Sequence, residues 1–246
     1  MDKSLYVAMT GAKEILQAQA VNNFNLANAS TTGFKAELSA FQSEPVAGSG
    51  YASRVYATDS TAGWNGAQGA MTTTGRPLDV AVQGPGFIAV QGPGGQEAYT
   101  RNGDLHIEPS GLLVTSTGQE VLGDSGPISI PPSASVKIAD DGTVSVVPLG
   151  QSPDTLATVG RIKLVNPAPE TLVRGSGGVF RLADGGKAPA DAAVKIASGV
   201  LESSNVDLAD AMVTMIDLAR NFDLQVKAMK TADTNAAASA QLLQPT

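Results

Sequence analysis

The last forty residues of the chain carry its longest regular apolar pattern, and this pattern limits what the chain can fold into. From Leu208 onward, apolar residues recur at alternating spacings of four and three, with Asp233 as the one polar member of the series. The apolar members are Leu208, Met212, Met215, Ala219, Phe222, Val226, Met229, Ala236, Ala240 and Leu243. These spacings place the side chains along one side of an α-helix, as in the seam of a coiled coil. The pattern therefore predicts a long helix that needs a partner helix.

We expect this helix to begin near Ser204. Ser204 and Asp207 have the three-residue spacing of a capping box, in which side-chain oxygens accept hydrogen bonds from the free amides at a helix start. Neither glycine nor proline interrupts the segment until Pro245. At about 1.5 Å per residue the helix would be roughly 55 Å long. A compact domain of this size is narrower than that, which again favours an extended assembly of helices.

The predicted partner lies near the N-terminus, where residues 4–28 repeat the spacing more weakly. Its apolar members are Leu5, Met9, Ala12, Leu16 and Leu26, and its polar members are Gln19 and Asn23. This helix is expected to end near Asn28, because the following residues are poor helix formers and lead to Gly33. Periodicity alone fits two core helices of a globular bundle equally well. The middle of the chain, which is not helical, favours two terminal helices that pair with each other.

Between the helices the pattern changes twice. Residues 39–75 are rich in Gly, Ser, Ala and Thr, and we expect an extended segment that packs along another part of the protein. Short apolar runs bounded by turn residues then predict strands at 78–82, 87–90, 97–100, 104–107, 112–115, 136–138, 144–147, 161–165 and 179–182. Closely spaced strands without intervening helices are typical of an antiparallel sheet.

The predicted fold class is therefore α+β, with an antiparallel all-β central domain inserted between N- and C-terminal helices that pair as a coiled coil. The expected domains are a helical domain of residues 1–30 and 205–246, an extended connecting segment of residues 31–77, and a β-rich outer domain of residues 78–204.

Charge and composition exclude several classes of partner. The net charge of −7 argues against nucleic acid and against direct insertion into an anionic membrane, since both favour basic proteins. No run approaches the ~20 apolar residues of a membrane span. The chain has no cysteine, so disulfides and cysteine-based metal sites are excluded. Polar residues interrupt the N-terminus within a few residues of Tyr6, which argues against a secretory signal.

Candidate chemistry is sparse. Residues 123–126 imitate the nucleophile loop of serine proteases, but a catalytic triad needs a histidine base and the single histidine, His106, lies nineteen residues before Ser125. His106 alternates with apolar neighbours and is expected to face solvent from a strand. A metal site would need further nitrogen or sulfur ligands. We therefore expect no catalytic residue, no metal and no cofactor.

Three sequence motifs carry a resemblance to the bacterial flagellar rod and hook proteins. Residues 25–35 resemble the N-terminal signature of that family, and residues 201–207, with the helix that follows them, resemble its C-terminal signature. Residues 78–87 and 98–103 are similar to its β-domain. The signature positions are Asn25, Leu26, Ala27, Asn28, Thr31, Gly33, Phe34, Ser204, Asn205 and Val206. Phe24 departs from the pattern, because the family usually has asparagine there.

The resemblance implies a structural subunit of the basal-body rod, the drive shaft of the flagellum. It implies assembly through the terminal helices, which transmit torque and line the export channel. The implied partners are proximal and distal rod subunits, copies of the chain itself and the flagellar type III export apparatus, with export to a periplasm-spanning rod without a cleaved signal peptide. Residues 1–3 and 121–132 are most similar to proximal-rod members. The alternatives are a distal-rod or hook subunit, or a secreted β-rich surface protein.

Overall fold

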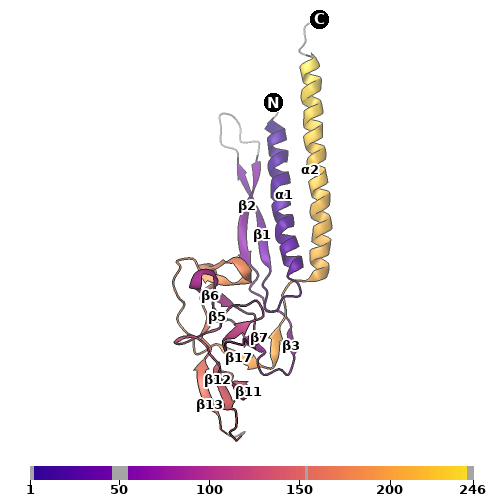
Figure 1. Cartoon of the computed structure of the whole chain (residues 1–246). Helices are drawn as coiled ribbons and strands as arrows, with labels where there is room; N and C mark the ends of the chain where they lie inside the picture. The colour runs from indigo at the N-terminus through magenta and orange to yellow at the C-terminus, as the bar shows by residue number, and fades with distance from the viewer. Residues whose placement is uncertain (1–2, 46–54, 153–154, 243–246) are drawn as a thin grey trace. The chain divides into compact units, whose positions relative to one another are not determined.

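The structure is a computed structural model that describes residues 3–45, 55–152 and 155–242 (Figure 1). The chain divides into two compact units, each built from separate stretches of sequence. The helical unit comprises residues 1–29, 36–65 and 206–246, and the β-rich unit comprises residues 30–35 and 66–205. The chain therefore passes from one unit to the other at residues 29/30, 35/36, 65/66 and 205/206. The N- and C-terminal helices contact each other and flank an antiparallel β region, which confirms the predicted α+β class.

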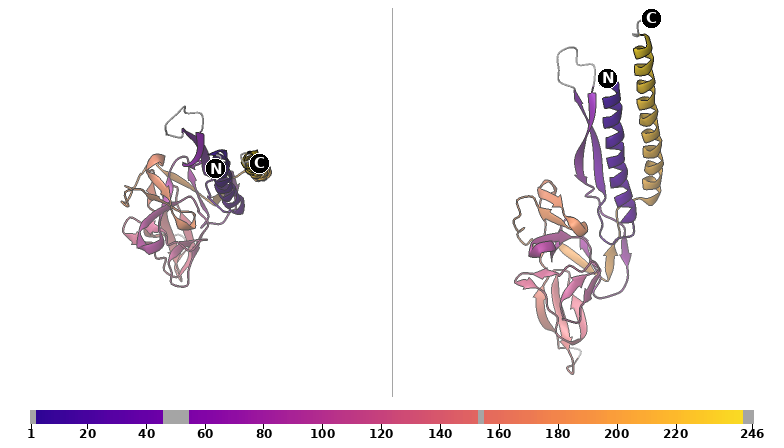
Figure 2. Two further views of the ribbon diagram at one scale, coloured as in Figure 1. Left: turned by 90° about the horizontal axis from the view of Figure 1, so that it is seen from above. Right: turned by 45° about the horizontal axis from the view of Figure 1, so that its top comes forward.

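Two long helices and a β-hairpin form the helical unit. Its elements are α1 (Lys3–Ala27), β1 (Glu37–Pro45), β2 (Val55–Trp64) and α2 (Leu208–Leu242). Strands β1 and β2 pair antiparallel, from Glu37 opposite Trp64 to Pro45 opposite Val55. Figures 1 and 2 show α1 between the hairpin and α2, and α1 contacts both.

Helices α1 and α2 run antiparallel to each other. Near the end of α1, the Asn22 side-chain amide donates a hydrogen bond of 2.8 Å to the carbonyl of Ala211, near the start of α2. Nearer the start of α1, Gly11 lies against Gln225, whose side chain would be 3.2 Å from a Cβ at position 11. The buried face of α1, which contacts α2 and the hairpin, carries mostly small apolar side chains. Its apolar members are Ala8, Ala12, Ile15 and Ala18.

The helix boundaries follow from capping groups. Helix α2 begins at Leu208 because the Asp207 carboxylate accepts hydrogen bonds from the amides of Ala209 and Asp210, at 2.8 and 3.2 Å. The predicted start near Ser204 is therefore wrong, because Ser204 belongs to the β-rich unit. Helix α1 ends at Ala27, close to the predicted end near Asn28, and both the backbone and side-chain amides of Asn28 donate to the carbonyl of Phe24.

The β-rich unit contains sixteen strands and three short 3₁₀ turns among the described residues. The strands are β3 (Met71–Thr73), β4 (Val80–Gln83), β5 (Phe87–Gln91), β6 (Glu97–Thr100), β7 (Leu105–Ile107), β8 (Leu113–Thr115), β9 (Leu122–Gly123), β10 (Gly126–Pro127), β11 (Ser133–Ile138), β12 (Thr143–Pro148), β13 (Ala157–Arg161), β14 (Leu164–Val165), β15 (Leu172–Arg174), β16 (Phe180–Leu182), β17 (Lys195–Ser198) and β18 (Val200–Glu202). The turns are η1 (Pro93–Gly95), η2 (Pro169–Thr171) and η3 (Ser176–Gly178).

All pairings between these strands are antiparallel. The largest sheet has the order β14-β5-β6-β16-β15, and a second sheet has the order β11-β12-β13. Strand β17 pairs with β4 and β18 pairs with β3, so the C-terminal end of the unit lies against its N-terminal end. The sheets enclose one apolar core, whose largest fully buried aliphatic members are Ile88, Leu105, Leu113, Ile162 and Ile196.

The predicted strands agree with the structure in most places, with two differences. The predicted strand 161–165 corresponds to β14 and includes only the last residue of β13, because Ile162 bridges Gly123 between these two strands, and the rest of β13 was not predicted. The segment 39–75 holds the hairpin β1–β2 and the strand β3, so residues 31–77 contribute to both units. Strands β9, β10, β15, β17 and β18 are too short or too polar to stand out in the sequence.

Candidate functional site

Helix α2 meets α1 along a face that only partly coincides with the predicted seam. The covered positions of α2 are Ala211, Thr214, Met215, Leu218, Phe222, Gln225, Met229 and Ala232. Met215, Phe222 and Met229 belong to both sets. The other seam members from Leu208 to Ala240 are exposed, and Leu243 lies outside the described residues. Helix α1 covers only one edge of the seam on α2, so the other edge of the seam remains exposed.

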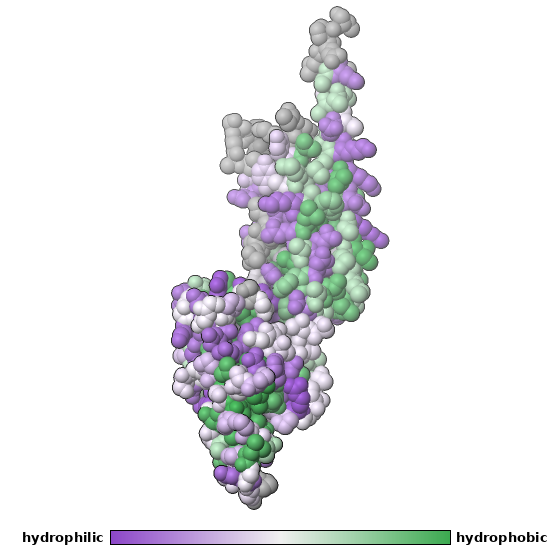
Figure 3. Space-filling model, in the orientation of Figure 1, coloured by the Kyte–Doolittle hydropathy of each residue, from purple (hydrophilic) through white to green (hydrophobic). Residues whose placement is uncertain are grey.

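Apolar side chains consequently remain exposed on both helices (Figure 3). On α2, a stripe here called the open α2 stripe is made of Leu208, Met212, Ile216, Ala219 and Val226, whereas Val213 and Leu224 are exposed outside it. Leu208 and Met212 are each 50% exposed. On α1, Met9 and Leu16 are exposed to a similar extent, whereas Leu5 and Leu26 are half-buried. Exposed apolar residues that line up along one face are characteristic of interaction surfaces.

Asn25 of the N-terminal signature forms a corner between α1 and β1. Its side-chain amide donates to the carbonyl of Glu37, and its side-chain oxygen accepts from the amide of Glu37, both at 2.8 Å. The side chain thus pairs with both backbone groups of one residue, as a neighbouring strand would. Leu26 is half-buried and Ala27 is exposed beside it. The Asn25 corner fixes the start of β1 against the end of α1.

Gly33 and Phe34 hold the segment 30–35 inside the β-rich unit. Gly33 has a φ of +68°, and its amide donates to the carbonyl of Glu202 at 2.8 Å. The carbonyl of Thr31 accepts a hydrogen bond from the amide of Phe34 at 3.3 Å. The Phe34 ring is buried, and the Arg174 guanidinium lies over it, 4.4 Å from the ring centre. Such a contact between a cation and an aromatic face is favourable where water is excluded.

A buried cluster of charges, here called the charged clasp, consists of Lys35, Arg101 and Glu202. The side chains of these residues are 1%, 4% and 0% exposed. One carboxylate oxygen of Glu202 accepts from Lys35 Nζ at 2.7 Å, and the other accepts from Arg101 Nε at 2.7 Å. Arg101 also donates three hydrogen bonds to the carbonyls of Val82, Gly84 and Gly86. Every charge in the clasp is therefore paired, as buried charges must be.

The clasp gathers three segments that lead to the other unit. Lys35 Nζ also donates to the carbonyl of Ala67 at 2.7 Å, and Glu202 accepts from the amide of Gly69 at 3.0 Å. Asn205, a residue of the C-terminal signature, donates its side-chain amide to the same Ala67 carbonyl and its backbone amide to Phe34. Ser204 is buried and Val206 is half-buried beside it.

Burial lowers the pKa of Lys35, and the Glu202 carboxylate opposes this shift. Sequence reasoning missed the clasp, although Lys35 and Glu202 lie within the two signatures. The available signal was a charged residue directly after Phe34 in the first signature and another directly after Leu201 in the second.

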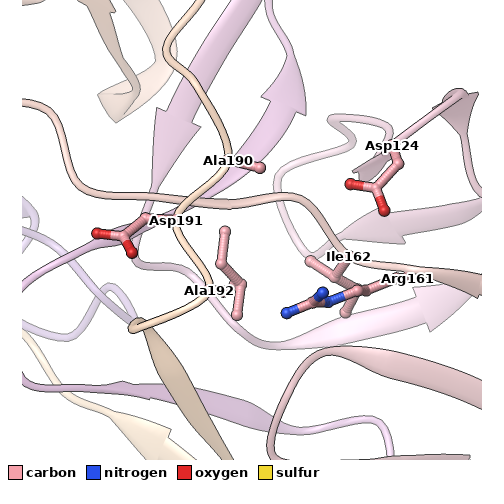
Figure 4. A pocket seen from close by; sticks show the side chains of 7 residues that line it. Asp124, Arg161, Ile162, Ala190, Asp191 and Ala192 are labelled. Atoms are coloured by element: carbon pink, nitrogen blue, oxygen red, sulfur yellow. The ribbon is translucent and has the colours of Figure 1, made fainter.

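The β-rich unit has no arrangement suited to catalysis among the described residues. A pocket lined by Asp124, Arg161 and Asp191 has a volume of about 90 Å³ (Figure 4), whereas ligand sites usually measure roughly 300–1,000 Å³. Arg161 donates to the carbonyl of Asp141, outside this pocket. Residues 123–126 form the turn between β9 and β10, and His106 is exposed on β7 as predicted.

Metal ligands and membrane spans were also sought in the part of the chain that the structure describes. There, no group of three or more His, Cys, Asp or Glu side chains is placed to hold a metal ion. Neither of its long helices is apolar enough over a sufficient length to cross a membrane.

Comparison with known proteins identifies two family models that match the chain. The flagellar hook protein FlgE/F/G D1 domain matches residues 81–146, and the C-terminal region of flagellar basal body rod FlgEFG proteins matches residues 197–242. The chain is 44% identical to the flagellar basal-body rod protein FlgF of Escherichia coli and 43% identical to that of Salmonella typhimurium, each over 99% of both chains. It is 32% identical to the rod protein FlgG of Bacillus subtilis, over 95% of this chain and 96% of that protein.

Proposed function

Because the chain belongs to the family of flagellar basal-body rod proteins, we propose that it joins the rod through the open apolar faces of α1 and α2. It is a structural subunit of the basal-body rod, and its family is not enzymatic. The rod family implies assembly with other axial subunits. The particular surfaces and neighbours are part of the proposal.

The observation that carries the proposal is that pairing with α1 leaves one apolar edge of α2 uncovered. Leu208, Met212 and Val226 are about half exposed although the α1-facing side of the same helix is covered. Burying the remaining surface of one such side chain is worth about 1 kcal/mol. A helix from a neighbouring subunit has the shape and the apolar character to cover this stripe. Several such contacts per subunit would hold a rod together under torque.

The neighbours that we propose are proximal and distal rod subunits and further copies of the chain. The identity of 44% to FlgF against 32% to FlgG favours an FlgF-type position over an FlgG-type or hook position. We include export by the flagellar type III apparatus, and helices that line the export channel, in the same proposal. The residues expected to make the assembly contacts are those of the open α2 stripe and the other exposed seam members, with Met9 and Leu16 on α1.

The proposal is tested by the substitution Met212→Asp, with Ala228→Asp as the matched control. Ala228 is exposed on the same helix but lies off the open α2 stripe, so both variants add the same charge to the same helix. Each variant replaces the natural protein in a flagellated strain, and its amount in purified basal bodies is measured by immunoblotting. We expect Met212→Asp to be lost from the basal bodies, together with motility, because a carboxylate cannot be buried unpaired at an interface.

The control variant should be retained and the cells should swim. Circular dichroism of both purified variants checks that the helical content of the protein is unchanged. If Met212→Asp enters the basal bodies as well as Ala228→Asp, the open α2 stripe is not the assembly surface.

A further inference from the structure

The chain's connections between its two units converge on one buried carboxylate. The chain crosses between the units four times, and on the β-rich side these crossings lie in three segments: residues 30–35, which contain two of them, residues 66–69 and residues 202–205. Glu202 belongs to the third segment, and its carboxylate accepts a hydrogen bond from Lys35 in the first and from Gly69 in the second. Any force that travels along the chain into the β-rich unit enters through these segments.

We propose that the charged clasp is a mechanical anchor that locks the connecting segments to the β-rich unit, so that load from the helices enters the unit through fixed chain and not through loose linkers. The load-bearing role rests on the proposed rod function, whereas the locking itself is a property of the β-rich unit alone. Arg101 ties the clasp to the sheet, because its remaining donors bind one carbonyl in β4, that of Val82, and two in the turn between β4 and β5, those of Gly84 and Gly86.

A carboxylate suits this task better than an apolar side chain. Apolar contacts have no preferred direction, whereas charged hydrogen bonds of 2.7 Å impose both distance and angle. Buried ion pairs seldom add net stability compared with apolar residues of the same volume. The clasp therefore makes sense as a device that specifies position, and the close approach of the chain supports this. A Cβ at position 69 would lie 1.9 Å from the carbonyl oxygen of Ser203, so the second and third segments are in direct contact.

The first arm of the test measures amide exchange in the purified full-length chain. Lys35→Met removes one cation and leaves Arg101 and Glu202 as a neutral pair, so no buried charge is left without a partner. The control is Glu97→Gln, which breaks the partly buried pair of Glu97 with Lys163 at 2.8 Å elsewhere in the same unit. We expect exchange in residues 30–35, 66–69 and 202–205 to rise at least about tenfold in Lys35→Met, while β5 and β6 change little. The control should leave the connecting segments unchanged.

Two results of this arm would overturn the proposal. One is unchanged exchange in the connecting segments. The other is a rise of the same factor in the connecting segments and in β5 and β6, because that would make the clasp an ordinary contribution to global stability.

The second arm measures swimming speed under low and high load in cells that carry each variant as their only copy. Lys35→Met should enter basal bodies in normal amounts, and the cells should swim normally in dilute buffer but more slowly than Glu97→Gln cells in viscous medium. Equal speeds of the two strains at all viscosities would refute the load-bearing role. If the unaltered protein itself is missing from basal bodies, the rod function and the load-bearing role both fail, while the exchange result still decides whether the clasp locks the segments.

Discussion

Replacing Gly33 by alanine tests how closely the first connecting segment is held. Gly33 has a φ of +68°, a left-handed conformation that is unfavourable for residues other than glycine. A Cβ at this position would lie 2.2 Å from both the carbonyl carbon and the carbonyl oxygen of Arg101, and 2.5 Å from the amide nitrogen of Asn102. All three are backbone atoms, so no side-chain rotation relieves the contact.

The expected cost follows from three contributions. The left-handed conformation costs alanine about 1–2 kcal/mol. Ordinary contact begins near 3.4 Å, so one of the two backbones must shift by about 1.2 Å, and such overpacking costs roughly 1–3 kcal/mol. A shift of that size breaks the 2.8 Å hydrogen bond from the Gly33 amide to Glu202, which is worth about 1 kcal/mol. Together these contributions destabilise the β-rich unit by roughly 3–6 kcal/mol.

Gly185→Ala is the matched control, because Gly185 lies in the same unit with a φ of +71°, and no atom lies within 4 Å of the place that an alanine Cβ would occupy there. It should cost only the conformational part, about 1–2 kcal/mol. The free energy of unfolding of the unit is measured from the slowest amides of β5 and β6, which exchange only on complete unfolding. If Gly33→Ala costs no more than Gly185→Ala, the close approach to Arg101 is not a real constraint.

Two further predictions concern pH and position in the rod. Burial raises the pKa of Tyr99 to about 12, so the folded state favours the neutral phenol; the resulting stability is complete below the ordinary pKa of 10.0 and is lost as pH rises toward 12. In urea unfolding, the free energy of unfolding of Tyr99→Phe should therefore fall less over this range than that of the natural chain. An identical fall in both proteins would contradict the pKa shift. A chimera with residues 36–200 of this chain between the terminal segments of an FlgG-type subunit should occupy the position of this chain in basal bodies, because partner choice requires surfaces that differ between family members. Occupation of the FlgG position would instead show that the terminal segments determine order.

Much of the fold was predictable because its elements repeat simple patterns. The four-three series from Leu208 identified α2, and turn pairs such as Asn102 with Gly103 separated the strands of the β-rich unit. Strands β17 and β18 were not predicted, because each is short and its partner lies more than a hundred residues earlier. Pairing over such distances depends on the whole tertiary structure and leaves little trace in local sequence.

The candidate sites, like the fold, were only partly predictable from the sequence. Periodicity located the apolar residues of α2, but it could not tell which edge of the seam faces α1, because both edges carry similar side chains. The charged clasp was not predicted, since an isolated Lys35 or Glu202 reads as an ordinary surface charge. Only the three-dimensional structure shows that Lys35 and Glu202, which are 167 positions apart in the sequence, form an ion pair.

The Asn25 corner has a consequence for the order in which the helical unit folds. Asn25 and Glu37 are twelve residues apart, so the loop that joins them closes quickly and at a small cost in entropy. The contact of Asn22 with Ala211 spans 189 residues and has to wait until the C-terminal helix finds its partner. Helix α1 and the first hairpin strand can therefore form a nucleus early, and α2 completes the unit as the last long-range event.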